Sequence, residues 1–259
     1  MSTFLFDKIV FGPVKSRRLG VSLGINLLPT NLKICSFDCI YCECGWNQKK
    51  QTESHTLPSK SEVKEKLAEK LAEMQVAGEL PDVITFAGNG EPTLHPDFAG
   101  IIDDTLELRD SLAPKARIAV LSNSSMIHKK AVFDALLKVD DNILKLDSAF
   151  EETIQLLDCP KGDFSLQKVV EQLAAFNGNV TIQTMFVRGS FKSKTVDNTT
   201  EKEVNAWIEI LRKIKPRSVM IYTIDRDTPL NTLQKVPVDE LKVIARKVQE
   251  AGIEVQVSG

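Results

Sequence analysis

Residues 21–48, VSLGINLLPTNLKICSFDCIYCECGWNQ, join a short apolar run to a loop that carries four cysteines. The apolar first third predicts a buried strand. Cys35, Cys39 and Cys42 follow it with the spacing C-x3-C-x2-C. This spacing lets one loop present three thiolates to different irons of a single iron-sulfur cube. One iron then has no protein ligand, and an open iron can bind and activate a small molecule.

The same loop is also compatible with two other kinds of metal site. A zinc ion takes four tetrahedral ligands, and Cys44 or His55 could supply the fourth. Cys44 could also complete an iron-sulfur cluster, although it lies only two positions after Cys42, which makes ligation of a separate iron sterically awkward. We favour Cys44 as a thiol without a ligand role.

Outward from this loop, short β-rich runs alternate with segments of helical period, and no flexible linker separates them. The predicted strands are residues 21–28, 83–87, 118–121, 143–147, 180–187, 219–223 and 253–257. Apolar stripes predict the helices between them, for example Val63, Leu67, Leu71 and Met74. Six strand-helix units and a last strand are fewer than the eight units of a closed barrel. The fold class is therefore α/β, a partial, open parallel β/α barrel.

We expect one domain over residues 1–259, with the cysteine loop at 29–47 and the barrel from about residue 20. The chain of 259 residues is 42% hydrophobic and 26% charged, which indicates a folded globular protein. No run approaches eighteen apolar residues, and Asp7 with Lys8 interrupts the opening segment, so we expect no membrane contact. The chain has five cysteines, an odd number, and most of them are clustered. This pattern indicates metal ligation in a reducing, cytoplasmic compartment.

The charge distribution argues against a general polyanion-binding protein, because the net charge is only -2. Residues 1–50 carry seven basic and three acidic side chains, which leaves open an anionic substrate near this segment. The simpler interpretation is that the basic residues are solvated loop charges, namely Lys15, Arg17, Arg18, Lys49 and Lys50.

The cysteine spacing, with the aromatic Tyr41 directly before the last cysteine, resembles the signature of the radical S-adenosylmethionine (SAM) superfamily. That resemblance implies a partial parallel barrel, which agrees with the strand pattern. It also implies that Cys35, Cys39 and Cys42 ligate a 4Fe-4S cluster whose open iron chelates the amino and carboxylate groups of SAM, and that Tyr41 contacts SAM. An electron from the cluster would split SAM into methionine and a 5'-deoxyadenosyl radical, which abstracts hydrogen from a substrate.

Further motifs follow the next strands, at the edge where barrel enzymes hold their ligands. The segment ITFAGNGEP resembles the glycine-rich motif of the superfamily. The resemblance implies that the SAM ammonium is held by Gly88, Asn89, Gly90 and Glu91. The SAM ribose would meet Ser122 and Asn123, although a short polar pair can also simply turn the chain.

Charged residues end two later strands. Asp147 shares a face with Lys145 at a period of two, so it either contacts SAM or substrate or belongs to a buried ion pair. Tyr222, Asp225 and Arg226 either receive an anionic group or form a surface ion pair.

The tract from the cysteine loop to LSNSS most resembles the iron-sulfur oxidoreductase group related to the tRNA wyosine-base enzymes. Those enzymes carry a second cluster with its own cysteines, whereas only Cys44 and Cys159 remain here. The chain also lacks an extended basic, aromatic-rich tract for gripping RNA. A small molecule, an RNA or a peptide therefore all stay open as substrate, and the resemblance implies an electron donor such as flavodoxin or ferredoxin.

Two other functions fit parts of the sequence. The first is a glycyl-radical-enzyme activating protein, whose peptide partner could dock on residues 188–199, although the composition of that segment favours a solvated loop. The second is a non-enzymatic iron-sulfur or zinc protein, in which the glycine-rich motif would have no ligand to bind.

Overall fold

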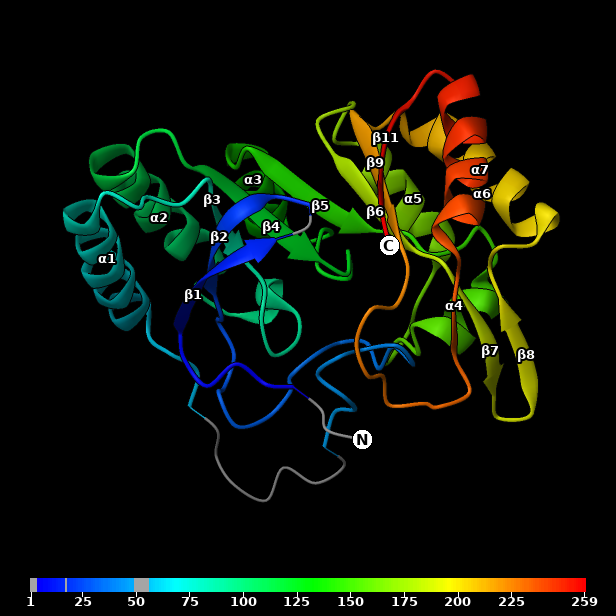
Figure 1. Ribbon diagram of the computed structural model, residues 1–259, viewed down its shortest axis with the longest axis horizontal. Coiled ribbons are helices and arrows are strands. Elements are labelled where there is room, and N and C mark those ends of the chain that lie inside the picture. Colours follow the sequence, from blue (N-terminus) through cyan, green and yellow to red (C-terminus); the bar gives the residue numbers. More distant parts are fainter. Residues whose placement is uncertain (1–3, 17, 49–55) are drawn as a thin grey trace.

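The computed structural model describes residues 4–16, 18–48 and 56–259, and its centre is a curved eight-stranded sheet (Figure 1). The strand order is β1-β2-β3-β4-β5-β6-β9-β11. Seven neighbouring strands run parallel: β2 (Gly20–Ile25), β3 (Val83–Phe86), β4 (Arg117–Ser122), β5 (Asp141–Lys145), β6 (Thr181–Met185), β9 (Ser218–Tyr222) and β11 (Glu254–Ser258). β11 does not pair with the opposite edge, so the predicted open parallel barrel is confirmed.

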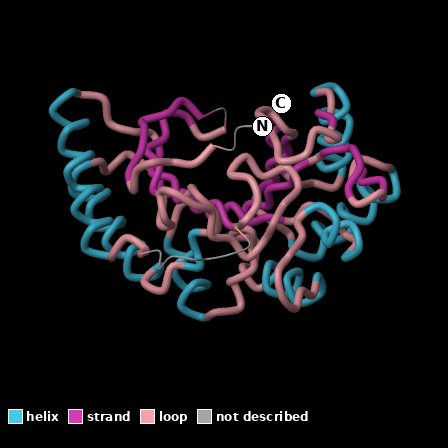
Figure 2. Tube along the Cα trace, turned by 90° about the horizontal axis from the view of Figure 1, so that it is seen from below, coloured by secondary structure: helices cyan, strands magenta, loops and turns pink. Residues whose placement is uncertain are grey.

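Helices connect successive parallel strands and cover the outside of the curve (Figure 2). They are α1 (Lys60–Ala77), α2 (Phe98–Leu112), α3 (Lys130–Lys138), α4 (Glu151–Leu157), α5 (Leu166–Ala174), α6 (Glu201–Ile214) and α7 (Val238–Glu250), with a short 3₁₀ turn η1 (Pro92–Leu94). In α1 the predicted stripe is buried, the Ser59 hydroxyl accepts a hydrogen bond from the amide of Glu62, and Gly78 ends the helix with φ 71°. None of the helices in the described ranges is long and apolar enough to cross a membrane.

The period of two along the strands separates a helix-covered face from a concave face. Ile84 and Phe86 of β3 point outward into the main core, under the helices. The concave face has its own small apolar cluster, formed by Leu19, Val83, Ala119 and Ile143. Polar side chains occupy other positions on this face, and the Ser22 and Thr85 hydroxyls lie 2.8 Å apart. The concave face is therefore only partly filled by apolar packing.

Two β-hairpins in the structure are not predicted from the sequence. β1 (Val10–Ser16) is an antiparallel edge strand on β2. Residues 188–199 are not a loop, because β7 (Val187–Phe191) and β8 (Lys194–Asp197) pair there, and β10 (Gln234–Lys235) pairs with β7. Lys192 and Ser193 form the turn with φ 49° and 60°, a conformation that glycine or asparagine normally signals. Because neither glycine nor asparagine occupies this turn, the composition of residues 188–199 does not predict a hairpin.

Candidate active site

The cysteine loop is fixed at one end by the glycine-rich segment after β3. The Ile34 amide donates to the Asn89 carbonyl over 2.9 Å, and the Glu91 amide donates to the Ile34 carbonyl over 3.1 Å. Gly90 has φ 133°, and a Cβ on it would lie 1.8 Å from the Ile34 carbonyl oxygen. The close approach that this glycine permits is thus one between two segments of the chain.

Asn89 supports the same loop from its other side. Its side chain is fully buried and bonds with the backbone of Phe6 and with the Pro29 carbonyl over 2.8–2.9 Å. The Gly88 carbonyl lies 3.5 Å from the Cys44 sulfur, which donates to it. These contacts give Gly88 and Asn89 a role in holding the cysteine loop.

A second backbone ladder holds the middle of the loop against residues 157–161, which follow α4. The Asp38 amide donates to the Asp158 carbonyl over 3.0 Å, and the Ile40 amide donates to the Leu157 carbonyl over 2.9 Å. The loop therefore has its backbone positions fixed by the ends of two separate elements before any cofactor is considered.

The three predicted ligands lie together in a small core of their own. Cys39 is buried, Cys35 and Cys42 are half-buried, and all three are free thiols. Apolar neighbours of Cys39 in this second core are Phe37, Ile40, Tyr41, Leu157, Met185, Val187 and Val196. Burial raises the pKa of the Cys35 thiol to about 11 and also raises the pKa of Cys39. Ligation of a metal would release those protons.

Lys33 faces all three thiols, and sequence reasoning missed it. Its side chain is 2% exposed, and its ammonium donates to the Gly45 carbonyl over 2.8 Å. Burial alone would lower the pKa of Lys33, but the charges of Cys42, Cys35 and Cys39 outweigh burial and raise it. The adjacent Cys44 thiol, with help from Lys33, lowers the pKa of Cys42 to about 5. A lysine inside the apolar run NLKIC was the available signal.

This donor set fits an iron-sulfur cluster. It offers three free thiols from one loop, one of low pKa, beside a buried cation that offsets thiolate charge. Among the described residues, no three His, Cys, Asp or Glu side chains are grouped as a single metal ion requires. His55, the alternative zinc ligand, lies outside the described residues, as do Arg17, Lys49 and Lys50.

Tyr41 enters a buried network that ties the loop to β5. Its hydroxyl donates to Asp158 Oδ1 over 2.9 Å, contacts Asp147 and accepts from Lys145. The Lys145 ammonium lies 3.0 Å from Asp147 Oδ2 and 3.6 Å from Asp158 Oδ1. Burial, reinforced by the charge of Asp147, raises the pKa of Asp158 to about 7.

The other carboxylate oxygen of Asp147 accepts a hydrogen bond from the Met185 amide over 3.0 Å, and the Asp147 side chain is fully buried. This geometry favours the ion-pair alternative for Asp147. Asp158 is a site residue that sequence reasoning missed, because it follows a helix and not a strand.

Glu91 joins the ends of β3 and β4 beside the loop. One carboxylate oxygen accepts the Thr93 amide over 3.1 Å and the other accepts the Asn123 amide over 2.6 Å. Burial raises the pKa of Glu91. The Asn123 side chain donates over 3.4 Å to the Cys35 sulfur, and the Ser122 hydroxyl accepts the Ser124 amide. The structure thus places the glycine-rich motif and the 122–123 pair around the first cysteine.

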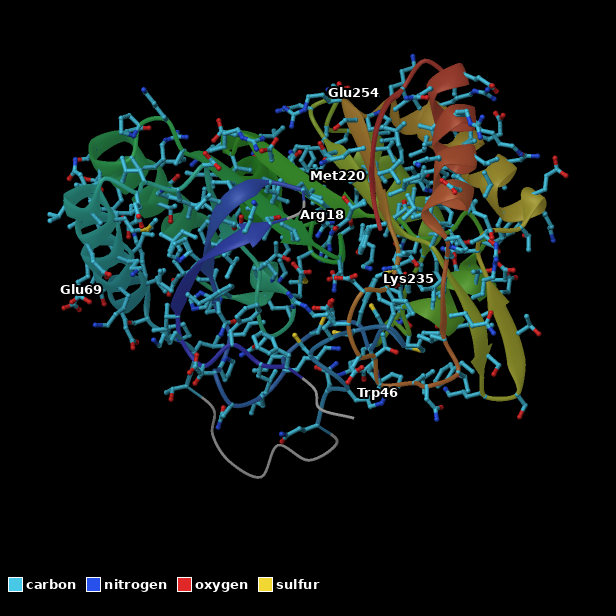
Figure 3. All side chains as sticks on the ribbon, viewed as in Figure 1. Arg18, Trp46, Glu69, Met220, Lys235 and Glu254 are labelled. Atoms are coloured by element: carbon cyan, nitrogen blue, oxygen red, sulfur yellow. The ribbon has the colours of Figure 1, made fainter. Side chains whose placement is uncertain are left out.

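Two adjoining cavities open on the concave face. The larger, about 640 Å³, is lined by Phe6, Phe11, Ser22, Thr85 and Leu121 among others. The smaller, about 250 Å³, includes Tyr41, Cys42, Met185 and Tyr222 in its lining. Both are bordered by Arg18, which Figure 3 shows between the β1–β2 hairpin and the strands of the opposite half. A ligand in these cavities would lie beside the cysteine loop.

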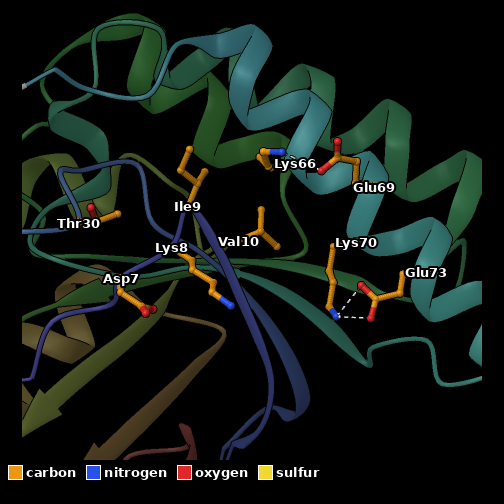
Figure 4. Close-up of a pocket in the computed structure, with 9 residues that line it drawn as sticks. All are labelled: Asp7, Lys8, Ile9, Val10, Thr30, Lys66, Glu69, Lys70 and Glu73. Atoms are coloured by element: carbon orange, nitrogen blue, oxygen red, sulfur yellow. Dashed lines mark hydrogen bonds and ion pairs between the residues drawn. The ribbon is translucent and has the colours of Figure 1, made fainter.

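A third cavity, of about 440 Å³, lies between α1 and the start of β1 (Figure 4). Its charges have both signs, and Lys66 and Lys70 pair with Glu69 and Glu73 at 2.9 Å. No cysteine lines it. We therefore locate the candidate active site at the cysteine loop.

The two charged residues at the end of β9 are ion-paired. Arg226 lies 2.9 Å from Glu43, and Asp225 lies 3.2 Å from Lys235. This favours the ion-pair alternative for both. Arg18, in contrast, is half-buried and lines the cavities, which favours contact with an anionic substrate over the alternative of a solvated loop charge.

An eight-stranded open barrel with a three-cysteine loop at its mouth defines a class of protein, and comparison with known families identifies it. The family model described as the radical SAM superfamily matches residues 32–197, more than half of the chain. The chain belongs to the radical SAM superfamily.

Curated relatives match most of this chain. A UPF0026 protein of Methanocaldococcus jannaschii is 33% identical over 219 residues, which are 83% of this chain and 63% of that protein. A protein of Brachyspira hyodysenteriae named GTPase Obg is 32% identical over 257 residues, which are 98% of this chain and 35% of that protein. The chain thus spans less than two thirds of either relative.

Solved structures share the fold. TYW1 with a lysine-pyruvate adduct bound has a TM-score of 0.63 at 17% identity, covering 88% of this chain and 73% of that chain. A radical SAM methyltransferase from Sphaerobacter thermophilus has a TM-score of 0.66 at 13% identity, covering 92% and 65%. The predicted resemblance to the wyosine-base enzymes is confirmed at the level of the fold.

Proposed function

We propose that this chain is a radical SAM enzyme in which Cys35, Cys39 and Cys42 ligate a 4Fe-4S cluster. When bound, such a cluster supplies the electron that splits SAM into methionine and a 5'-deoxyadenosyl radical, which takes hydrogen from the substrate. The observation that carries the proposal is the set of three free thiols facing buried Lys33 beside a cavity.

Several residues of the chain have separate roles in this proposal. The Lys33 ammonium offsets the negative charge of the thiolates. Tyr41 and its network anchor the loop to the barrel and limit the freedom of the thiols. Of the groups predicted to contact SAM, we propose that the backbone of residues 88–91 and the Asn123 side chain bind it. The buried Asn89 and Asp147 side chains act as supports, and Glu91 positions Asn123 through its amide.

The substrate is open between a small molecule, an RNA and a peptide. The family and its fold support radical chemistry and not a particular substrate, since the similar structures include TYW1 and a methyltransferase. We propose a flavodoxin or ferredoxin as electron donor and the reducing cytoplasm as the compartment, because five free thiols suit it.

The test is anaerobic reconstitution with iron and sulfide. We expect a reducible cluster whose EPR spectrum shifts on adding SAM, and 5'-deoxyadenosine on adding dithionite. Cys39→Ala should lose iron and product, whereas Cys159→Ala, a control thiol in the same small core, should keep both. A spectrum that SAM leaves unshifted would contradict the proposal, as would tetrahedral zinc by X-ray absorption in protein purified without oxygen.

A further inference from the structure

We propose that Arg18 is the binding site for a carboxylate or phosphate group of the substrate, on the concave face beside β6 and β9. The inference rests on the proposed function, because it assigns a chemical class to the substrate of that reaction.

The turn between β1 and β2 presents Arg18 in a fixed position. The amides of Arg18 and Leu19 donate to the Ser16 hydroxyl over 3.3 and 3.2 Å. The Gln256 side chain of β11 donates to the Arg18 carbonyl over 3.3 Å. The hairpin turn is thus tied to the last strand of the sheet, across the open side of the barrel.

The guanidinium itself is held but not neutralised. Its centre lies 4.7 Å from the Tyr222 ring centroid, and Nη1 donates to the Gln183 side chain over a long 3.4 Å. A guanidinium has five N–H donors. Among the described residues, no carboxylate oxygen lies within 4.0 Å of Arg18, so most of its hydrogen-bonding capacity has no charged acceptor.

The other arginines of the described chain show how unusual this is. A carboxylate lies within 4.0 Å of each of them except the exposed Arg246; the paired ones are Arg109, Arg117, Arg188, Arg212, Arg217 and Arg226. Lys145, the neighbouring cation on the concave face, is neutralised by two aspartates. Arg18 is therefore a preorganised positive charge that two oxygens of a carboxylate or phosphate can complete in bidentate fashion.

The position of Arg18 favours the substrate over SAM as the source of that anion. The motifs that resemble SAM-binding segments end β3 and β4, whereas the Arg18 guanidinium contacts β6 and β9 on the other side of β5. Arg18 borders both cavities, and the smaller one reaches Cys42. A small anion held here would keep the rest of its molecule beside the cysteine loop.

The test uses the reconstituted protein with saturating SAM, titrated calorimetrically with malonate and with inorganic phosphate. Neutral malonamide serves as the control ligand. We expect the wild type to bind at least one of the two anions and not malonamide. Arg18→Gln should weaken that binding at least tenfold, and Arg18→Lys, which keeps the charge without the planar fork, should fall between. Arg212→Gln, an exposed arginine of α6, is the matched control and should bind as the wild type does.

Three outcomes would overturn the inference. The first is no anion binding by the wild type, and the second is equal anion affinity in wild type and Arg18→Gln. The third is a tenfold loss of SAM affinity in Arg18→Gln with malonate binding unchanged, which would assign the guanidinium to the carboxylate of SAM. Failure of the proposed function is distinguishable, since the protein would then form no 5'-deoxyadenosine while still binding the anion through Arg18.

Discussion

Tyr41 has a structural role in this site. The sequence places it by resemblance next to SAM, while the structure places its hydroxyl among Lys145, Asp147 and Asp158. All three polar partners are buried, so each would lose a hydrogen bond or charge partner without the hydroxyl. The tyrosine therefore anchors the cysteine loop to the barrel, whatever its ring contacts.

Asp158 leads to a prediction about pH. Its pKa is about 7 in the folded chain and about 3.9 for an unperturbed aspartate. Between these values the folded state retains a proton that the unfolded state has released. The free energy of unfolding should therefore fall as pH rises from about 4 to 7, by at most about 1.4 kcal/mol per pH unit from this group. Urea denaturation of the apoprotein at pH 5 and pH 7 measures the slope.

Asp158→Asn should flatten that dependence, because the variant has no proton to release. Asp163→Asn, an exposed aspartate in the same segment, is the control and should retain the wild-type slope. Equal slopes in wild type and Asp158→Asn would show that the carboxyl does not titrate in this range.

At the scale of elements, the glycine-rich segment is above all a support for the cysteine loop. Gly90→Ala would place a methyl group against the Ile34 carbonyl and force a side chain into a left-handed conformation. The conformation alone costs about 1–3 kcal/mol. We expect the variant to fold with a displaced loop and to lose most of its iron and sulfide after reconstitution, which colorimetric assay of both elements measures.

Gly78→Ala provides the matched glycine control. Gly78 also has a positive φ, at the end of α1, but no atom lies within 4 Å of its added Cβ. The substitution should cost about 1–2 kcal/mol and leave the iron content unchanged. Iron retention by Gly90→Ala equal to that of Gly78→Ala would mean that this contact does not position the ligands.

Elements with a strong periodic pattern could be predicted from the sequence. The apolar stripe of α1 follows from a period of 3.6, and the parallel strands follow from short apolar, β-rich runs that alternate with helical segments. The β7–β8 hairpin could not be predicted, because Lys192 and Ser193 make a turn that their residue types do not signal. β1 was missed because most of its residues are exposed, which leaves no alternating apolar pattern.

At the scale of the whole molecule, the candidate site, like the fold, could be predicted from the sequence only in part. The cysteine spacing and the motifs after β3 and β4 are local patterns, and the fold brings them together as predicted. Asp158 and Arg18 act through partners far away in the sequence, namely Tyr41 and Gln183, whereas Lys33 acts on the cysteines of its own loop through its burial. Their roles depend on burial and on missing or added charges, which a single sequence does not display.

Apart from the small cluster on the concave face, the described residues form two cores, and this predicts two levels of stability. The main core lies under the helices, whereas the cysteine loop covers a smaller core that includes Cys39 and Tyr41. In the apoprotein the loop is held by a few backbone bonds and one buried network. We expect its amides, such as those of Asp38 and Ile40, to exchange hydrogen well before those of β4 and β5.

Ligation would add three covalent anchors to that loop, because each thiolate would be bonded to a different iron. Reconstitution should then slow exchange in peptides covering residues 34–42 at least tenfold, while peptides from β4 and β5 exchange as before. Hydrogen-exchange mass spectrometry under anaerobic conditions measures both sets in one sample, and Cys39→Ala treated identically is the control. If loop and sheet amides were already equally protected in the apoprotein, the two cores would unfold as one, and the loop would owe its order to the barrel alone.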